Sequence, residues 1–161
     1  MDIEYYRRIT KWSPELKGVF SLSDLKVIFS EIGEPALYKN LNSAATLGIL
    51  TKVIRGLYSV PGTQPEIISN RIDPESYIST GTVLAKSGLI GSIPGKRVQA
   101  VKIGRPRTYS TDEFIIEHLS ISPEYFFGFE NQDGIRYATP EKALIDACYY
   151  RFKGKPISFD P

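Results

Sequence analysis

Apolar residues in this chain occur only in short runs. No run exceeds about five residues, whereas a helix that spans a membrane needs roughly 20 apolar residues. Apolar residues nevertheless make up 42% of the 161 positions, which is enough to build a packed core. A chain of this size and pattern is expected to fold as one ordinary domain or two small ones, built from many short helices and strands.

The first residues of the chain and its single cysteine and histidine restrict the class of protein further. The first eight residues are acidic and then basic, without the apolar segment of a signal peptide, so we expect a cytoplasmic protein. The sequence has one cysteine and one histidine, which excludes an internal disulfide framework and a classical zinc site. We therefore expect neither a metal nor another cofactor.

The first 62 residues are predicted to form a winged helix-turn-helix domain. An apolar stripe between Tyr5 and Trp12 predicts a first helix. Ser23 is the expected N-cap of a short second helix, and Pro35 is expected at the first position of a third helix. Two β-rich runs within residues 49–60 predict a hairpin after these helices.

The third helix and the hairpin supply the candidate DNA-binding residues. The apolar positions of the helix leave a polar face on its opposite side, and the hairpin adds one basic residue on its first strand and another at its tip. The candidates are Tyr38, Lys39, Asn40, Asn42, Ser43, Thr46, Lys52 and Arg55. Such a helix can lie in the major groove of operator DNA, while the hairpin contacts phosphates or the minor groove. The alternative is an ordinary solvated polar surface.

Residues 63–161 are expected to form a second domain, an α-β-β-β-α module that makes the whole chain an α+β protein. Residues 63–73 are predicted to be a linker, and Ser79 is predicted to cap a helix over 80–86. Three β-rich runs predict its strands: 98–103, 114–119 and 125–129. A last helix is expected after Thr139 and is predicted to bury one apolar stripe: Ala143, Leu144, Ala147, Cys148 and Phe152.

Charge is unevenly distributed in this second domain. No acidic residue occurs from Ser76 to Thr111, whereas residues 112–146 are strongly acidic. The basic residues of the first stretch form a candidate patch for an anionic partner or for antitoxicity: Lys96, Arg97, Lys102, Arg105 and Arg107. The alternative is that neighbouring acidic strands neutralise these cations.

No group of residues in the sequence indicates catalysis. His118 lies in a predicted strand without a second histidine, so a structural role is expected. Cys148 is predicted to be a buried core thiol. Lys142 and Asp146 are spaced as an ordinary surface ion pair, worth about 0.2–0.5 kcal/mol. We therefore expect a protein that is not an enzyme.

Four segments occur in an order and spacing that resemble a known family. They are 21–25 (Ser-Leu-Ser-Asp-Leu), 47–50 followed by 54–58, 77–79 with Gly88 and Leu89, and 139–146 (Thr-Pro-Glu-Lys-Ala-Leu-Ile-Asp). Over residues 20–152 the chain resembles the AbiEi family of antitoxins and transcriptional regulators, which belong to type IV toxin–antitoxin systems that act in abortive infection, a form of phage defence. The hairpin segment 55–58 and the helix segment 141–146 are the most specific parts of this resemblance.

The resemblance implies an N-terminal winged helix that binds operator DNA and represses its own operon, and a C-terminal domain that confers antitoxicity. It also implies a functionally linked toxin similar to nucleotidyltransferases, which the antitoxin counters without a tight complex. A second hypothesis comes from a different class of function. In that hypothesis the chain is a non-catalytic interaction module whose winged helix binds protein and whose basic 96–107 stretch binds RNA or an acidic partner.

Overall fold

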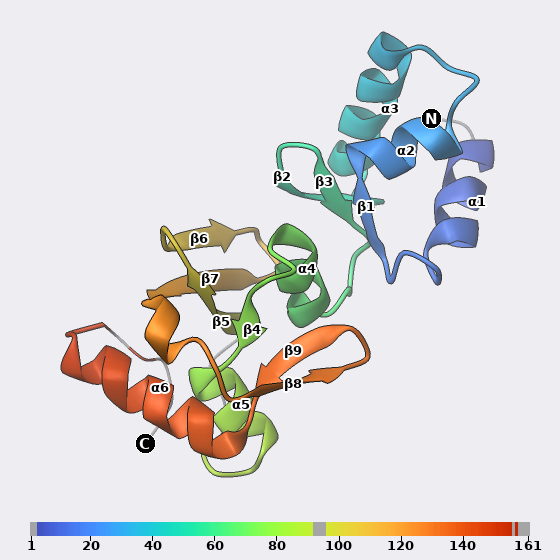
Figure 1. Cartoon of the computed structure of the whole chain (residues 1–161). Coiled ribbons are helices and arrows are strands. Elements are labelled where there is room, and N and C mark those ends of the chain that lie inside the picture. The colour runs from blue at the N-terminus through green and yellow to red at the C-terminus, as the bar shows by residue number, and fades with distance from the viewer. Residues whose placement is uncertain (1–2, 92–95, 156, 158–161) are drawn as a thin grey trace. The chain divides into compact units, whose positions relative to one another are not determined.

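The computed structural model describes residues 3–91, 96–155 and 157, and the chain divides into two compact units (Figure 1). The N-terminal unit covers residues 1–68 and the C-terminal unit covers residues 69–161. Each unit contains both helices and strands, which confirms the predicted α+β class. The division falls inside helix α4 (Pro65–Ile72), so the predicted linker over 63–73 is wrong: most of that stretch is helical.

The N-terminal unit contains three helices and a three-stranded sheet. Along the chain these are α1 (Ile3–Trp12), β1 (Val19–Ser21), α2 (Leu22–Ile28), α3 (Glu34–Thr46), β2 (Thr51–Ile54) and β3 (Leu57–Ser59). Strand β3 lies between β1 and β2 and is antiparallel to both. The hairpin therefore forms where the sequence predicts it, and the strand between α1 and α2 joins its sheet.

The helices of this unit are held by one apolar cluster. Tyr5 and Ile9 of α1 are buried, and the Tyr5 ring stacks on Phe29 with their centroids 4.2 Å apart. Leu25 of α2 and Leu41 of α3 complete the contact between the helices, each with no exposed surface. Burial in this cluster raises the pKa of Tyr5 to about 12.

The N-cap of α2 is Ser21, which corrects the prediction of Ser23. The Ser21 hydroxyl accepts a hydrogen bond from the Asp24 backbone N–H, with 3.1 Å between the heavy atoms. The Asp24 carboxylate in turn accepts from the Ser21 backbone N–H, at 2.8 Å, so the two residues form a capping box. The helix can begin directly at Leu22 because Ser21 ends strand β1 in an extended conformation.

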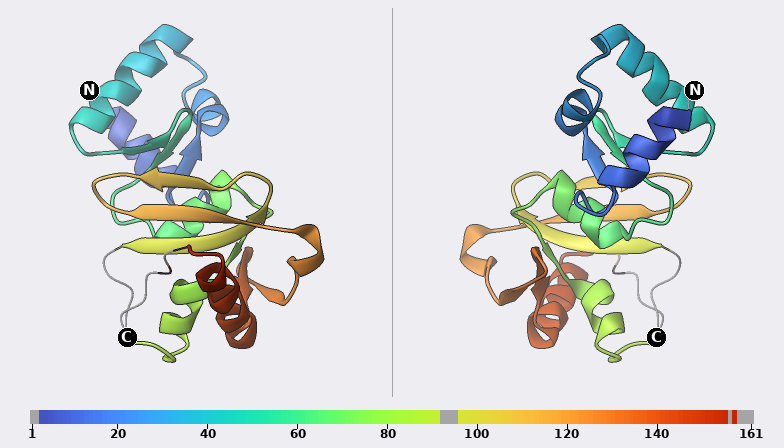
Figure 2. Two further views of the ribbon diagram at one scale, coloured as in Figure 1. Left: turned by 90° about the vertical axis from the view of Figure 1, so that its left-hand side faces the viewer. Right: turned by 90° about the vertical axis from the view of Figure 1, so that its right-hand side faces the viewer.

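The C-terminal unit is built on one mixed six-stranded sheet. Its further elements are β4 (Tyr77–Ile78), α5 (Thr80–Lys86), β5 (Arg97–Ile103), β6 (Arg107–Ser110), β7 (Ile115–Ile121), the short 3-10 helix η1 (Pro123–Tyr125), β8 (Phe129–Gln132), β9 (Ile135–Ala138) and α6 (Pro140–Phe152). The strand order is β6-β7-β5-β4-β9-β8, and the pairs β5–β7 and β4–β9 are parallel. Strands β5, β6 and β7 are seen side by side in Figure 2.

Helices contact both faces of this sheet. In the parallel β5–β7 pair, Gln99 lies beside Glu117, and Ala100 lies beside His118 on the opposite face. The Gln99 side chain bonds Thr80 at the start of α5, while His118 bonds Ser69 of α4. Helix α5 therefore covers the Gln99 face and also packs against α6, whereas α4 reaches the His118 face.

The predicted α-β-β-β-α layout of this unit is wrong in detail. Strands β5 and β7 correspond to the predicted runs 98–103 and 114–119. The third predicted run, 125–129, is the end of η1 and a loop, and strand β8 begins only at Phe129. Strands β4 and β6 were not predicted, because two to four residues are too short to show a period.

Candidate nucleic-acid interface

Helix α3 is fixed to the N-terminal core by one side and leaves its other side open. Leu37, Leu41 and Ala44 are at most 1% exposed and attach the helix to the core. Pro35 occupies the second helical position rather than the predicted first, because Gly33 is the N-cap. The only acidic residue of the helix, Glu34, lies in its first turn and forms an ion pair with Lys26 of α2.

The predicted DNA-contacting residues of α3 lie on or beside this open side. Lys39, Asn42 and Thr46 are exposed, and so is Tyr38 at 42%. Asn40 and Ser43 are half-buried at the flanks. The Thr46 hydroxyl donates to the Asn42 carbonyl at 3.0 Å, so its proton is engaged within the helix. The exposed side is thus a small surface with one cation, one amide, one hydroxyl and one tyrosine ring, and a second amide lies at its flank.

The hairpin places two further predicted residues at exposed positions. Lys52 on β2 and Arg55 in the turn are both exposed. Gly56 has φ +79°, the left-handed conformation that suits glycine at this turn. The Gly56 carbonyl accepts a hydrogen bond of 2.8 Å from the Leu22 backbone N–H, which ties the turn to the start of α2. Arg55 is therefore presented from an anchored tip.

The five basic residues predicted as a patch in the C-terminal unit do not form one. Arg97 and Lys102 lie in β5 five residues apart, which is about 16 Å along an extended strand. Arg97 pairs with Glu117 of β7, with 3.2 Å between Nη1 and Oε1, and Lys102 pairs with Asp73. The predicted alternative, neutralisation by a neighbouring acidic strand, thus holds for Arg97, whereas Lys102 is neutralised by Asp73, which follows α4. Arg105 and Arg107 are exposed.

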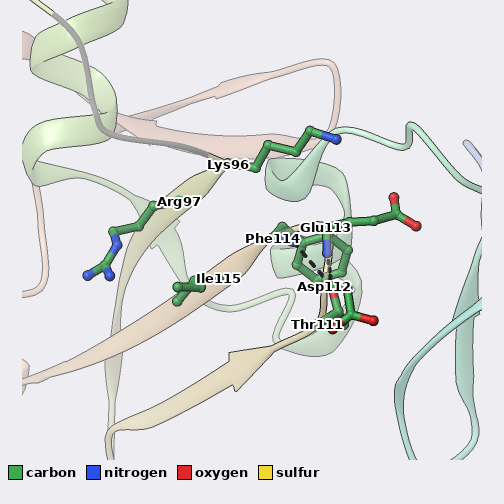
Figure 3. A pocket seen from close by; sticks show the side chains of 7 residues that line it. All are labelled: Lys96, Arg97, Thr111, Asp112, Glu113, Phe114 and Ile115. Atoms are coloured by element: carbon green, nitrogen blue, oxygen red, sulfur yellow. Dashed lines mark hydrogen bonds between the residues drawn. The ribbon is translucent and has the colours of Figure 1, made fainter.

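An open hollow of about 240 Å³ lies beside the remaining basic residue, Lys96 (Figure 3). Its lining includes Arg97 as well as Asp112 and Glu113, so cations and anions are mixed. The Thr111 hydroxyl oxygen accepts the backbone N–H groups of Glu113 and Phe114 at 3.2 Å and shapes the turn. The mixed lining gives the hollow no clear preference for an anionic ligand.

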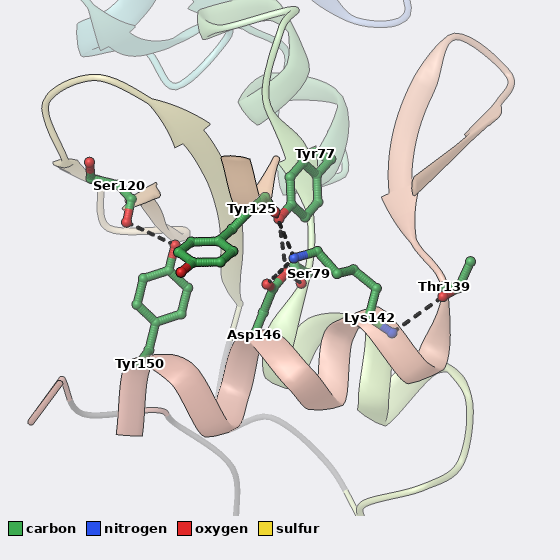
Figure 4. Close-up of polar contacts among 8 residues, drawn as sticks. All are labelled: Tyr77, Ser79, Ser120, Tyr125, Thr139, Lys142, Asp146 and Tyr150. Carbon is green, nitrogen blue, oxygen red and sulfur yellow. Dashed lines mark hydrogen bonds and ion pairs between the residues drawn. The ribbon is translucent and has the colours of Figure 1, made fainter. Parts of the chain in front are cut away.

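A buried polar cluster, which the sequence did not predict, lies between helix α6 and the segment of strand β4 in the C-terminal unit (Figure 4). It consists of Tyr77, Ser79, Lys142 and Asp146, each at most 4% exposed. The Tyr77 and Ser79 hydroxyls donate to Asp146 Oδ2 at 3.0 and 2.7 Å. Lys142 Nζ donates to Asp146 Oδ1 at 2.7 Å. Burial and the Asp146 carboxylate raise the pKa of Tyr77, which therefore stays a proton donor.

The loop before β8 encloses the Lys142 side chain. Lys142 Nζ donates a second hydrogen bond to the Tyr125 carbonyl at 2.9 Å and lies 4.7 Å from the centre of the Phe127 ring. Gly128 adopts φ +77°, and a Cβ at this position would lie 3.0 Å from the Lys142 Cγ atom. The Lys142 ammonium therefore ties this loop to α6, and the cluster is a structural element rather than an accessible site.

The cluster overturns the prediction for helix α6. Its cap is as predicted: Thr139 accepts from the Lys142 backbone N–H at 3.2 Å, and Pro140 starts the helix. The buried face of the helix differs from the prediction, because Lys142 and Asp146 form a buried ion pair and not a surface pair. Because this polar side also faces the core, the predicted stripe is divided. Ala143 and Ala147 are buried as predicted, whereas Leu144, Cys148 and Phe152 are exposed, so Cys148 is not a core thiol.

His118 is buried, with 1% of its surface exposed. Its Nε2 atom lies 2.9 Å from the Ser69 hydroxyl oxygen, and its Nδ1 atom has no hydrogen-bond partner among the described residues. Burial lowers the pKa of His118 to about 4, so the ring is neutral near pH 7.

Comparisons with known proteins assign neither a family nor a function to the chain. No protein-family model matches the chain, and no curated protein matches its sequence. Among the described residues, no three His, Cys, Asp or Glu side chains gather in an arrangement that would bind a metal ion. Among the same residues, no helix is both long and apolar enough to cross a lipid bilayer.

Proposed function

We propose that the chain is a DNA-binding transcriptional regulator and that its N-terminal unit is a winged helix-turn-helix domain. The observation that carries this proposal is the open side of α3. Its exposed Lys39, Asn42 and Thr46 lie opposite the buried Leu37 and Leu41, and no acidic residue follows Glu34 in the helix. Asparagine can pair with adenine and lysine with guanine or phosphate, so α3 is the proposed reader of the major groove.

In this proposal the β2–β3 hairpin is the wing. Arg55 at its tip contacts phosphates or the minor groove, and Lys52 adds a second phosphate contact. The hydrogen bond between Leu22 and Gly56 keeps the tip close to the N-terminal end of α2, so that the wing binds without first becoming ordered.

For the C-terminal unit we propose antitoxicity towards a nucleotidyltransferase-like toxin, without a tight complex and without catalysis by this chain. This part rests on the resemblance to the AbiEi family and on Arg105 and Arg107, which stay exposed while Arg97 and Lys102 are paired. Reversal of Arg105 and Arg107 to glutamate tests it. Loss of rescue from a co-expressed toxin, with DNA binding intact, supports the assignment, and full rescue by the folded variant removes it.

The competing proposal is a protein-binding module, and one observation favours it. Tyr38 on the exposed side of α3 is 42% exposed, and Leu47 directly after the helix is 64% exposed. Apolar side chains at such a position suit a protein groove better than a phosphate backbone.

A binding titration separates the two proposals. The intact chain is titrated by fluorescence anisotropy against duplex DNA from upstream of its own gene, against a shuffled duplex and against RNA of the same length, at several salt concentrations. The DNA proposal predicts tighter binding to the native duplex and an affinity that falls with salt. Equal, weak binding to all three nucleic acids would contradict it and favour the protein-binding module.

A further inference from the structure

The outward side of helix α6 is apolar from Leu144 to Phe152. Leu144, Ile145 and Phe152 leave 54%, 59% and 94% of their surfaces exposed, and Cys148 is exposed as well. At about 100° per residue these four side chains fall within a sector of about 100°, which we call the outer face of α6. Scattered apolar residues on a surface need no explanation, but a continuous row along one helix marks an interaction surface.

The charges along this helix indicate which partner could cover the outer face of α6. Glu141 is exposed at the N-terminal end, whereas Arg151 in the last turn and Lys155 just beyond the helix are exposed at the other end. A helix with one acidic and one basic end is complementary to an antiparallel copy of itself. In such a pair each acidic end meets the other's basic end, and the two helix dipoles oppose each other favourably.

The apolar residues fit the same arrangement. Leu144 and Phe152 each lie four residues from Cys148, so a two-fold axis at Cys148 places Leu144 of one copy against Phe152 of the other. This single two-fold rotation would then cover both ends of the apolar row, Leu144 and Phe152. An aromatic side chain such as Phe152 can bury about 150–250 Å² when it is covered, which makes it the main anchor.

We propose that the outer face of α6 binds the same face of a second copy of this chain, with the two helices antiparallel about Cys148. The interface is isologous, its centre is the apolar row, and its rim is formed by Glu141 of each copy and the basic end of the other. This proposal does not depend on DNA binding and can succeed or fail separately.

Sedimentation velocity over a range of protein concentrations tests the interface. We expect the intact chain to form a dimer, and we expect the Leu144→Glu, Phe152→Glu double variant to lose at least about tenfold in association. Both side chains are exposed, so circular dichroism should show an unchanged fold. Val27→Glu is the matched control, since Val27 is 74% exposed on α2 of the other unit and should leave the dimer intact. A monomeric intact chain, or a double variant that still dimerises, would overturn the proposal.

Charge reversal and cross-linking test the orientation. Glu141→Lys should weaken the dimer, and adding Arg151→Glu and Lys155→Glu should restore it, because the opposite charges meet again. The chain has a single cysteine, so a short bis-maleimide can link two copies only through Cys148. Rapid linkage in the intact dimer, and slow linkage in the double variant, are expected. Failure of both the charge rescue and the linkage in a dimeric protein would reject the antiparallel arrangement.

Discussion

Lys142 and Asp146 lie one turn apart on helix α6 and form an ion pair with 2.7 Å between Nζ and Oδ1, although their side chains are only 4% and 1% exposed. The same spacing on a solvated helix would contribute little to stability. Here both charges are removed from water, and the two hydroxyls on Asp146 and the carbonyl and aromatic ring near Lys142 compensate for that cost. The pair therefore fixes how α6, β4 and the loop before β8 fit together.

Removal of one member of this pair should be strongly destabilising. Lys142→Met leaves the Asp146 carboxylate buried without its cation, and we expect it to lower the free energy of unfolding by about 3–5 kcal/mol. Lys96→Met, at an exposed position of the same unit, is the control and should change little. Urea unfolding followed by circular dichroism measures both variants. A loss below 1 kcal/mol in Lys142→Met would show that the cluster does not stabilise the unit.

Gly128 should tolerate no side chain. Gly128→Ala combines a positive φ with a Cβ only 3.0 Å from Lys142 Cγ, so the loop or the Lys142 side chain must move. Gly88→Ala is the matched control, because Gly88 has φ +69° but nothing within 4 Å of the added Cβ. We expect the Gly128 variant to lose about 1–3 kcal/mol more than the Gly88 variant in the same unfolding assay. Equal losses would mean that backbone strain alone acts at Gly128.

Burial of His118 predicts a pH-dependent stability. Its pKa is about 4 when folded, below the usual 6.5, so between these pH values the unfolded chain binds a proton that the folded chain does not. The contribution of neutral His118 to the free energy of unfolding is fully present above pH 6.5. It is lost as the pH drops towards 4, which lowers the free energy of unfolding by up to about 3 kcal/mol. His118→Gln removes this component.

Unfolding of the intact chain and of His118→Gln at pH 7 and pH 4.5 measures the difference. The single tryptophan, Trp12, lies in the N-terminal unit, so circular dichroism is the better probe of the unit that contains His118. Parallel pH profiles for the two proteins would show that His118 is accessible to protons in the folded state.

Arg55 should act on the DNA backbone and not on base sequence. Arg55→Ala is expected to weaken binding to native and shuffled duplexes alike, and to reduce the slope of log affinity against log salt by about one unit. Anisotropy titrations at several salt concentrations provide the slope. Weaker binding to the native duplex alone would assign Arg55 to base recognition instead.

The sequence predicted those elements whose formation depends on residues close together in the chain. The apolar spacing of α3, the glycine of the β2–β3 turn and the Thr139-Pro140 start of α6 all act within a few residues. Helix α4 was missed because its polar composition resembles a linker, although Ile68 is buried.

The buried polar cluster could not be predicted from local spacing. The hydroxyls that satisfy Asp146 come from Ser79 and Tyr77, which precede it by 67 and 69 residues. Without these partners, Lys142 and Asp146 have the pattern of a solvated pair, and Leu144, Cys148 and Phe152 have the pattern of a buried stripe. The error over the orientation of α6 and the error over the ion pair thus have one cause.

The affinity of α3 variants for duplex DNA from upstream of the gene tests whether α3 reads the major groove. The Lys39→Ala, Asn42→Ala, Ser43→Ala triple variant should stay folded and lose about 1–3 kcal/mol for each base contact removed. Lys11→Ala, which removes one exposed cation from α1, is the control and should bind nearly as well as the intact chain. An unchanged affinity in the folded triple variant would contradict the assignment of α3 to the major groove.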